Sequence, residues 1–286
     1  MIIRMRTAFN TVFSIGIITL ILTSCTQEKP KQIKQEKKQS NLKIDTNQAF
    51  ITFAFLNETK DSLVSLPVED EKIKPELATH AIIENRVIPI IFSNTKLESQ
   101  TSNGRQTSHN FANNGGSFFT FKEPAKQGDF ALLVNQDFID HNKVMPFIEK
   151  DKKTEEPTIS ILSKKYNRKI AKSATIAELE DQAQIILTLF EVKNDSALAV
   201  LSYLHHDQLI TLDFPAKYDE MSTWRVDDGG IFDFENLQVL SVFQSDKSIK
   251  IATVFWGAEG YNLNFYESTN GVFKSIAEAY GYSAPL

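Results

Sequence analysis

Cysteine is almost absent from this chain, since Cys25 is the only one among 286 residues. The rest of the chain can therefore contain no disulfide, no cysteine-ligated zinc and no thiolate nucleophile. Small exported proteins often depend on disulfides for their stability. Residues 50–286 do not need them, because a chain of that length can bury a sizeable apolar core.

The motifs of the common enzyme classes are missing as well. The sequence contains no G-x-S-x-G elbow, no H-E-x-x-H zinc motif, no P-loop and no G-x-G-x-x-G loop. Its five histidines are scattered, apart from the pair in His205-His206-Asp207. Because adjacent strand residues point to opposite faces, this cluster predicts a polar hairpin tip and not a metal site. We expect no cofactor, and binding is favoured over catalysis.

Only one long apolar run is present, near the start of the chain. Arg4 and Arg6 precede the run Ala8 to Leu22, which ends in Leu22-Thr23-Ser24-Cys25. This layout resembles the signal peptide and lipobox of bacterial lipoproteins, in which the cysteine is acylated. The resemblance covers residues 1–25. It implies a signal peptide over 1–24 and a lipid anchor, with acyl chains such as palmitate, on Cys25.

Two other interpretations of this run fit less well. A transmembrane helix needs about 20 apolar residues, whereas this run is shorter and contains Asn10, Ser14 and Thr19. A plain secretory signal would end in an A-x-A-like site, which the sequence lacks. The resemblance therefore implies a lipid-anchored protein of the bacterial cell envelope, on its periplasmic face or at the cell surface.

Charge is unevenly distributed along the chain. Residues 26–49 contain six Lys, three acids and five Gln, a net charge of +3, and this composition predicts a flexible tether over 25–49. Residues 50–286 carry 23 basic and 33 acidic residues, a net charge of −10. That balance argues against a nucleic-acid partner, which would need a cationic surface. The local basic stretch 164–169 predicts a solvated strand end or turn, with an anion site as the alternative.

The body, residues 50–286, is predicted to be mainly β, with antiparallel sheets joined by short hairpins. It contains many Phe and Ile in short runs, which suit the half-buried surface of a sheet. Short turns such as Lys193-Asn194-Asp195 join neighbouring runs and favour antiparallel pairing. The expected strands are 49–55, 62–67, 79–83, 86–92, 118–121, 130–134, 158–162, 170–179, 184–192, 197–204, 209–214, 237–243, 249–256, 261–266 and 272–276.

Two segments leave details of the architecture open. An α+β fold with one helix near 175–190 is the alternative to strands there, because apolar residues recur at helical spacing. The polar stretch 98–117 is unusually long for a loop inside a compact domain. It predicts either a tolerated insertion or boundary between two modules, or a mobile functional loop.

An internal repeat is a further possibility for the fold. Asp129, Asp181 and Asp228 mark similar acid-to-strand segments, about 50 residues apart, which is the period of a four-stranded propeller blade. The period resembles that of FG-GAP-type repeats and implies a propeller-like fold. None of the three segments has the full D-x-D-G-x-x-D calcium loop, so no metal is carried over.

The candidate ligand site combines the two tryptophans of the chain with nearby carboxylates. Each tryptophan is followed closely by an acid and a glycine at a predicted strand-to-loop junction. An aromatic ring beside a carboxylate can hold a sugar or a cation. The structural alternative places the tryptophans in the core, and no catalytic residue is assigned. The candidate residues are Trp224, Asp227, Asp228, Trp256 and Glu259.

Two short motifs concern modification. Asp61-Ser62-Leu63 and Asp195-Ser196-Ala197 resemble the D-S/T-aliphatic sites that are O-glycosylated in exported proteins of Bacteroidetes. Both fall in predicted turns, where Asp-Ser is common for structural reasons. Ser62 and Ser196 are therefore candidate O-glycosylation sites.

Together these features predict an envelope lipoprotein with a binding or assembly role, whose partner is an envelope protein or a glycan. Two alternatives remain open. One is an envelope glycan hydrolase that uses an Asp/Glu acid–base pair. The other is an inhibitor or immunity-type lipoprotein, because an acidic body suits a basic target.

Overall fold

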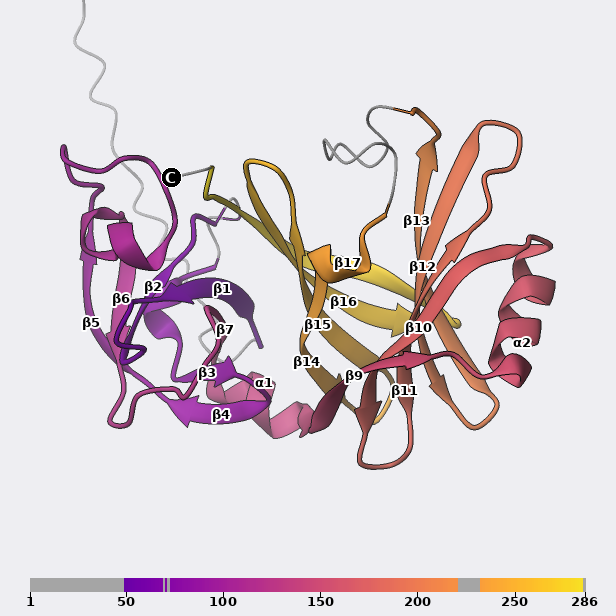
Figure 1. Cartoon of the computed structure of the whole chain (residues 1–286). Coiled ribbons are helices and arrows are strands. Elements are labelled where there is room, and N and C mark those ends of the chain that lie inside the picture. The colour runs from indigo at the N-terminus through magenta and orange to yellow at the C-terminus, as the bar shows by residue number, and fades with distance from the viewer. Residues whose placement is uncertain (1–48, 69, 71–72, 221–231, 285–286) are drawn as a thin grey trace, which may run out of the picture. The chain divides into compact units, whose positions relative to one another are not determined.

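The computed structural model describes residues 49–68, 70, 73–220 and 232–284. The predicted signal peptide, Cys25 and nearly all of the predicted tether lie outside these residues. The described part is mainly β and is built from antiparallel sheets, as predicted (Figure 1). All of it belongs to one unit, Ile44–Leu286.

Seven of the described strands form the first sheet, in the order β4-β3-β7-β1-β2-β6-β5. The end strands β4 and β5 are separated in the chain by Ile90 alone. One continuous stretch therefore pairs with β3 through its first half and with β6 through its second half, which closes the sheet into a small barrel. The strands are β1 (Ile51–Leu56), β2 (Ser62–Ser65), β3 (His80–Ile83), β4 (Arg86–Pro89), β5 (Ile91–Lys96), β6 (Gly116–Thr120) and β7 (Phe130–Val134).

The closed barrel explains why its central strands are apolar on both faces. In β1, Ala54 and Leu56 belong to the cluster inside the barrel, whereas Phe53 and Phe55 belong to a cluster outside it. Successive strand residues point to opposite faces. Burial on both faces therefore favours a nearly continuous apolar run, which is ITFAFL in β1, with Thr52 as its one polar residue, and FALLV in β7.

Ten described strands form the second sheet, in the order β8-β14-β15-β16-β17-β13-β12-β11-β10-β9. Its end strands β8 and β9 are again consecutive in the chain, on either side of Pro146. β13 and β17 pair only at Thr211 and Val272, so this sheet is a half-barrel that stays open between them. The strands are β8 (Lys143–Met145), β9 (Phe147–Lys153), β10 (Ile170–Leu179), β11 (Gln184–Phe190), β12 (Ser196–His205), β13 (Gln208–Lys217), β14 (Leu237–Gln244), β15 (Ile249–Trp256), β16 (Gly260–Thr269) and β17 (Val272–Tyr282).

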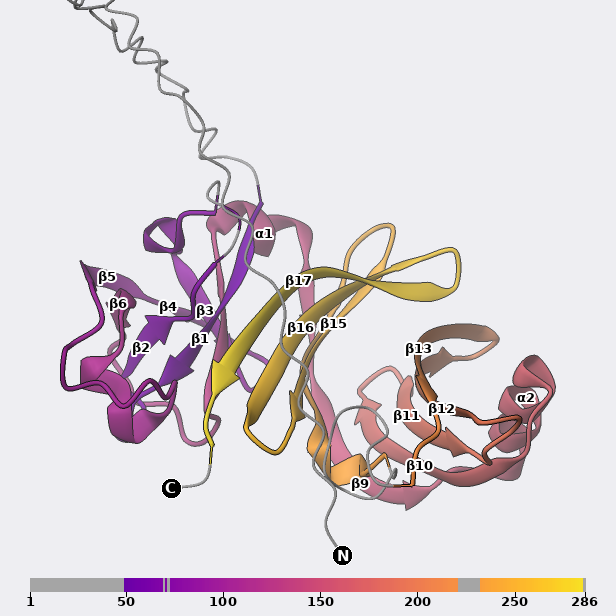
Figure 2. The same cartoon turned by 90° about the horizontal axis from the view of Figure 1, so that it is seen from above.

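The two sheets lie side by side (Figure 2), and aromatic side chains pack between them. Phe130 of β7 lies 4.5 Å from Tyr261 of β16 between ring centroids. Phe138 lies 5.5 Å from Phe243 of β14 and 5.9 Å from Phe265 of β16. Phe138 belongs to α1 (Gln136–His141), the helix through which the chain passes from the barrel to the half-barrel. The described core is therefore continuous across both sheets.

The predicted hairpin turns are confirmed, and their residues explain them. Glu84 and Asn85 join β3 to β4 with φ values of 50° and 62°. Asn194 and Asp195 join β11 to β12 with φ values of 51° and 56°. Two-residue turns with positive φ match the twist of paired strands, and Asn and Asp tolerate that conformation best among residues with a side chain.

The strand predicted at 158–162 is wrong, because this segment lies within α2 (Glu156–Tyr166). Pro157 occupies the first turn, where a proline is compatible with a helix, and Asn167 ends the helix in the left-handed conformation. Thr158 and Leu162 are one turn apart and are both buried. Leu162 packs with Ile186 and Phe190 on the outer face of the half-barrel.

The described helices are short. Besides α1 and α2, they are the 3-10 helices η1 (Pro75–Leu77), η2 (Ser108–Asn113) and η3 (Phe234–Asn236). Among the described residues, no helix has the length and apolar character needed to cross a membrane.

The preferred strand assignment over 175–190 is confirmed, since β10 and β11 occupy it and Gln182 turns between them at φ 68°. The helical spacing arose from burial on both faces: Ile185 packs inside the half-barrel and Ile186 packs against α2. The propeller is not found, because the described strands form two large sheets and no repeated four-stranded blade. Asp129 precedes β7 and Asp181 lies between β10 and β11, whereas Asp228 lies outside the described residues.

The polar loop 98–117 connects β5 to β6, which are neighbours in the barrel. The change from the first sheet to the second occurs later, at α1. Side-chain amides hold the loop together. Asn114 Nδ2 donates to the carbonyl oxygens of Arg105 and Asn110, each at 2.9 Å, and Asn110 Nδ2 donates to the same Arg105 oxygen at 2.9 Å. The loop is therefore an internally bonded insertion between two strands of one sheet.

Candidate functional site

The tryptophan-based candidate site lies only partly within the described residues. Trp256 ends β15, is half-buried, and lies 5.5 Å from Phe130 and 5.3 Å from Tyr261 between ring centroids. Glu259 is in the exposed turn before β16, where its carbonyl oxygen accepts a hydrogen bond from the Ser283 N–H at 2.9 Å. The other three candidates, Trp224, Asp227 and Asp228, lie outside the described residues. Trp256 is thus part of the packing between the two sheets.

The two candidate O-glycosylation serines differ in exposure. Ser62 is half-buried at the start of β2 and donates from Oγ to Asp61 Oδ1 at 3.0 Å. A hydrogen bond from the Asn57 side chain is the main reason that the pKa of Asp61 lies below its usual value. Ser196 is exposed at the start of β12. Ser196 is therefore the more accessible of the two hydroxyl groups.

The cluster His205-His206-Asp207 and the basic stretch 164–169 both lie at the ends of strands or helices. His205-His206-Asp207 spans the turn from β12 to β13, as predicted, and His206 has φ 49°. The basic stretch covers the end of α2 and the turn that follows it. Arg168 Nε donates to the Glu191 carbonyl oxygen at 2.8 Å, which joins this turn to the end of β11. In the described part of the chain, no group of three His, Cys, Asp or Glu side chains could hold a metal.

One concave site in the described part of the chain was not predicted from the sequence. A cavity of about 560 Å³ lies between the barrel and the half-barrel. One wall comes from β1 and from Pro67, Val68, Asp70 and Ile73, which follow β2. The other wall comes from β16 and from residues 276–280 of β17. We call this cavity the β17 groove.

A second cavity, of about 610 Å³, adjoins the β17 groove. The two share Pro67, Val68, Asp70 and Ile73. The second cavity extends along the end of β5 and the beginning of β6, where Lys96 and Glu98 line it. The concave surface is therefore longer than the β17 groove alone.

Backbone geometry leaves part of β17 open along this groove. At its end, the Tyr282 N–H donates to Gln106 Oε1 and the Tyr282 carbonyl oxygen accepts from the Gln106 N–H, each at 2.9 Å. Both backbone groups of Tyr282 therefore point away from β16. In an antiparallel ladder this direction repeats every second residue. The backbone groups of Tyr280 and Glu278 accordingly point away from β16 too, into the groove.

Gln106 is held in place by Tyr261. The Tyr261 hydroxyl donates to the Gln106 carbonyl oxygen at 2.7 Å. Burial raises the pKa of Tyr261 above its usual value, so the hydroxyl stays protonated and able to donate. Since Tyr261 also makes an edge-to-face contact with Trp256, the predicted Trp256 is indirectly connected to one end of the β17 groove.

The side chains of the groove provide hydrogen bonding, negative charge and apolar contact. Its charged residues, among those that the structure describes, are Asp70 and Glu278, and both are acidic. Asn262 and Asn264 of β16 add amide groups opposite Tyr280 and Glu278 in the strand register. Ile276 and Tyr280 are each 51% exposed. Such a surface can bind a ligand through all three kinds of contact.

Comparisons with known proteins assign this chain to no family. No family model, no curated protein and no solved structure matches this chain. Its function is therefore argued from the residues themselves.

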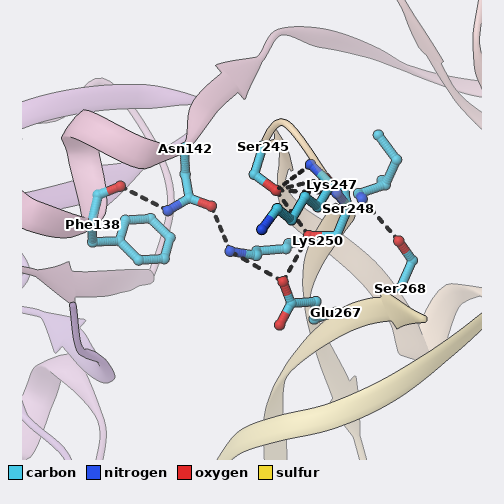
Figure 3. A network of polar contacts seen from close by, with 9 residues as sticks. Phe138, Asn142, Ser245, Lys247, Ser248, Lys250, Glu267 and Ser268 are labelled. Atoms are coloured by element: carbon cyan, nitrogen blue, oxygen red, sulfur yellow. Dashed lines mark hydrogen bonds and ion pairs between the residues drawn. The ribbon is translucent and has the colours of Figure 1, made fainter. Parts of the chain in front are cut away.

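A second polar cluster lies near α1, where its side chains form a continuous network of hydrogen bonds and ion pairs (Figure 3). Lys250 Nζ contacts Asn142 Oδ1 at 2.6 Å and Glu267 Oε1 at 3.4 Å. Asn142 Nδ2 donates to the Phe138 carbonyl oxygen at 2.8 Å, and Ser248 Oγ donates to Glu267 Oε1 at 2.7 Å. The Lys250 side chain is only 14% exposed. Its contacts are satisfied within the protein, so this cluster stabilises the junction between α1 and β15.

The sequence carried only weak signals for the β17 groove. The C-terminal half of β17 alternates Ala277 and Ala279 with the larger Glu278 and Tyr280. This pattern predicts one close-packed face, and Ala277 and Ala279 do pack against the core between the sheets. Which segment lies opposite Glu278 and Tyr280 depends on contacts that are distant in sequence. The sequence alone therefore could not reveal the groove.

Proposed function

We propose that this chain is a lipid-anchored protein of the bacterial cell envelope whose body binds a partner through the β17 groove. The anchor part of the proposal is supported by the lipobox-like Leu22-Thr23-Ser24-Cys25 and by the polar composition of residues 26–49. An acylated cysteine followed by such a segment would hold the body near a membrane and leave it free to reach a partner.

One observation supports the binding part of the proposal. The β17 groove combines a concave shape, an open strand edge and partly exposed Ile276 and Tyr280. Exposed apolar side chains beside oriented polar groups are typical of binding sites. The described residues around the groove supply contacts and orientation, which are what a binding or assembly role requires.

Position-specific crosslinking in the producing bacterium tests this proposal. A photoreactive amino acid at Ile276, in the groove, should give a discrete covalent adduct with a partner. The matched control is Ile148 of β9, which is 68% exposed and does not line the groove. We expect an adduct at position 276 and none at 148. Equal labelling at both positions, or none at either, would contradict a binding role for the groove.

A further inference from the structure

The open edge of β17 is bounded at both ends. At the C-terminal end, Gln106 occupies the backbone groups of Tyr282. At the other end, the Thr211 N–H donates to the Gly271 carbonyl oxygen at 3.2 Å, where β13 meets β17. Between these points no described residue outside β16 and β17 forms a backbone bond with β17. Phe265 pairs with Ala277 and Tyr266 pairs with Ser275, so β17 has a bulge at Ile276. On the C-terminal side of this bulge, the open ladder groups are those of Glu278 and Tyr280.

An unpaired strand edge is a template for another strand. Its N–H and C=O groups repeat every second residue and match the backbone of an extended peptide. Gln106 shows that such groups of β17 can be bound from this side, since its N–H donates to the Tyr282 carbonyl oxygen and its side-chain Oε1 accepts from the Tyr282 N–H. Nine residues, 273–281, lie between Val272 and Tyr282. A six-residue strand, about 20 Å long at about 3.3 Å per residue, is long enough to span the open groups of Glu278 and Tyr280.

The neighbouring cavity leaves room for the added strand. The groove of about 560 Å³ lies along residues 276–280. Its opposite wall, with Pro67, Val68 and Ile73, offers apolar contact to side chains of the incoming strand. The barrel therefore forms the opposite wall of this cavity, with β1 close to β17.

The charge of the groove favours one chemical class of ligand over the others that could bind along this edge. Among the described residues that line the groove, the charged side chains are Asp70 and Glu278, and both are negative. An incoming strand with Lys or Arg would complement them. A second copy of this chain would bring another acidic pair into the same interface, and like charges in close cross-strand positions are destabilising. A glycan lacks the repeating amide pattern that matches the ladder.

We infer that the β17 groove binds a cationic, extended peptide segment of a partner protein, which pairs as a strand with the open edge at Glu278 and Tyr280. This inference rests on the proposed binding function and specifies the partner's chemistry. It involves main-chain hydrogen bonds to β17, side-chain contacts with the apolar wall and an ion pair with Glu278.

The test uses the soluble body, residues 47–286, and a fluorescein-labelled peptide of the sequence Lys-Val-Lys-Val-Lys-Val. Fluorescence polarisation should show saturable binding. Two further peptides carry N-methyl groups on alternate residues, one on the Lys positions and one on the Val positions. An added strand donates to β17 from one set only. One methylated peptide should therefore bind at least about tenfold more weakly, while the other binds nearly as well.

Protein variants locate the binding to the edge. Tyr280→Pro removes an outward N–H without removing a bond to β16, and Tyr280→Ala is its matched control for loss of the ring. We expect Tyr280→Pro to bind at least about fivefold more weakly than Tyr280→Ala. Glu278→Lys should weaken binding similarly, whereas Lys274→Glu on the same strand should not. Thermal melts of each variant verify folding.

The possible outcomes separate this inference from the broader proposal. No binding by the Lys-Val peptide, or loss of affinity with both or neither of the methylated peptides, would overturn strand addition. If position 276 still crosslinks a partner in cells, the groove binds by another mode and the proposed function survives. Self-association of the body that Tyr280→Pro abolishes would show that a second copy occupies the edge, which would also overturn the inference.

Discussion

Gly281 lies directly beneath the ring of Tyr261. A Cβ built on Gly281 would be only 2.1 Å from Tyr261 Cζ and 2.3 Å from its hydroxyl oxygen. Only glycine can occupy this position while Tyr261 keeps its hydrogen bond to Gln106. The relationship connects the end of β17 to the polar loop of the barrel.

Gly281→Ala should therefore destabilise the body. The added methyl must displace a buried ring, and overpacking of this kind typically costs about 1–3 kcal/mol. Urea unfolding monitored by fluorescence measures the change. Lys274→Ala, an exposed position on the same strand, serves as the control and should change stability by less than about 0.5 kcal/mol. A Gly281→Ala protein as stable as wild type would show that Tyr261 is free to move.

Lys250 should contribute more to stability than its neighbour in the same hairpin. Lys250→Met keeps the apolar stem but leaves the buried Asn142 oxygen without its 2.6 Å partner. An unsatisfied buried polar group costs about 1–3 kcal/mol. Lys247 is exposed, so Lys247→Met should have little effect in the same denaturation assay. Equal effects of the two substitutions would argue against the network in Figure 3.

Trp256 should behave as a packing residue. Trp256→Ala removes the ring that lies against Phe130 and Tyr261, and truncation of a packed aromatic typically costs about 3–5 kcal/mol, with the lower end expected for a half-buried side chain. Trp256→Phe should retain most of the stability. Thermal melts compare the two variants. An unchanged melting temperature for Trp256→Ala would favour the exposed ligand site that the sequence pattern suggests.

Asp61 should make the free energy of unfolding depend on pH. Its pKa in the folded protein lies below the ordinary 3.8, first because of the hydrogen bond from Asn57. A lowered folded-state pKa means that the contribution to stability is fully present above the unfolded-state pKa and is lost as the pH falls through the folded value. Asp61→Asn should thus be less stable than wild type at pH 6. The difference in the free energy of unfolding between the two proteins should become smaller below about pH 3. Urea unfolding across this pH range measures this difference. A difference that stays constant with pH would contradict a lowered pKa for Asp61.

Cys25 should be the site of membrane attachment. Cys25→Ser should abolish labelling by a fatty-acid probe and either release the body or leave an unprocessed precursor. Deleting residues 27–46 should keep the label and barely change the melting temperature of the body, because so polar a segment buries little surface. Wild-type protein that takes up no fatty-acid label and fractionates as soluble would contradict the lipobox interpretation.

Local features of the sequence were sufficient for most of the strands and hairpins. Glu84-Asn85 and Asn194-Asp195 are turn residues between apolar runs, and a turn with positive φ pairs the runs that flank it. The segment 158–162 was assigned wrongly because a short apolar run does not distinguish a strand from a buried helix face. In the structure Thr158 and Leu162 are buried on one face of α2 against the half-barrel.

By itself, then, the sequence determined the β character of the body, its hairpin turns, its charge distribution and the lipobox-like start. The closure of each sheet was decided by tertiary structure, because the pairing of β3 with β7 and of β8 with β14 joins segments that are distant in the chain. The same holds for the β17 groove, whose two walls come from residues 51–73 and 262–280. Turn chemistry acts over a few residues and is visible in the sequence, whereas a groove depends on which surfaces meet after the chain has folded.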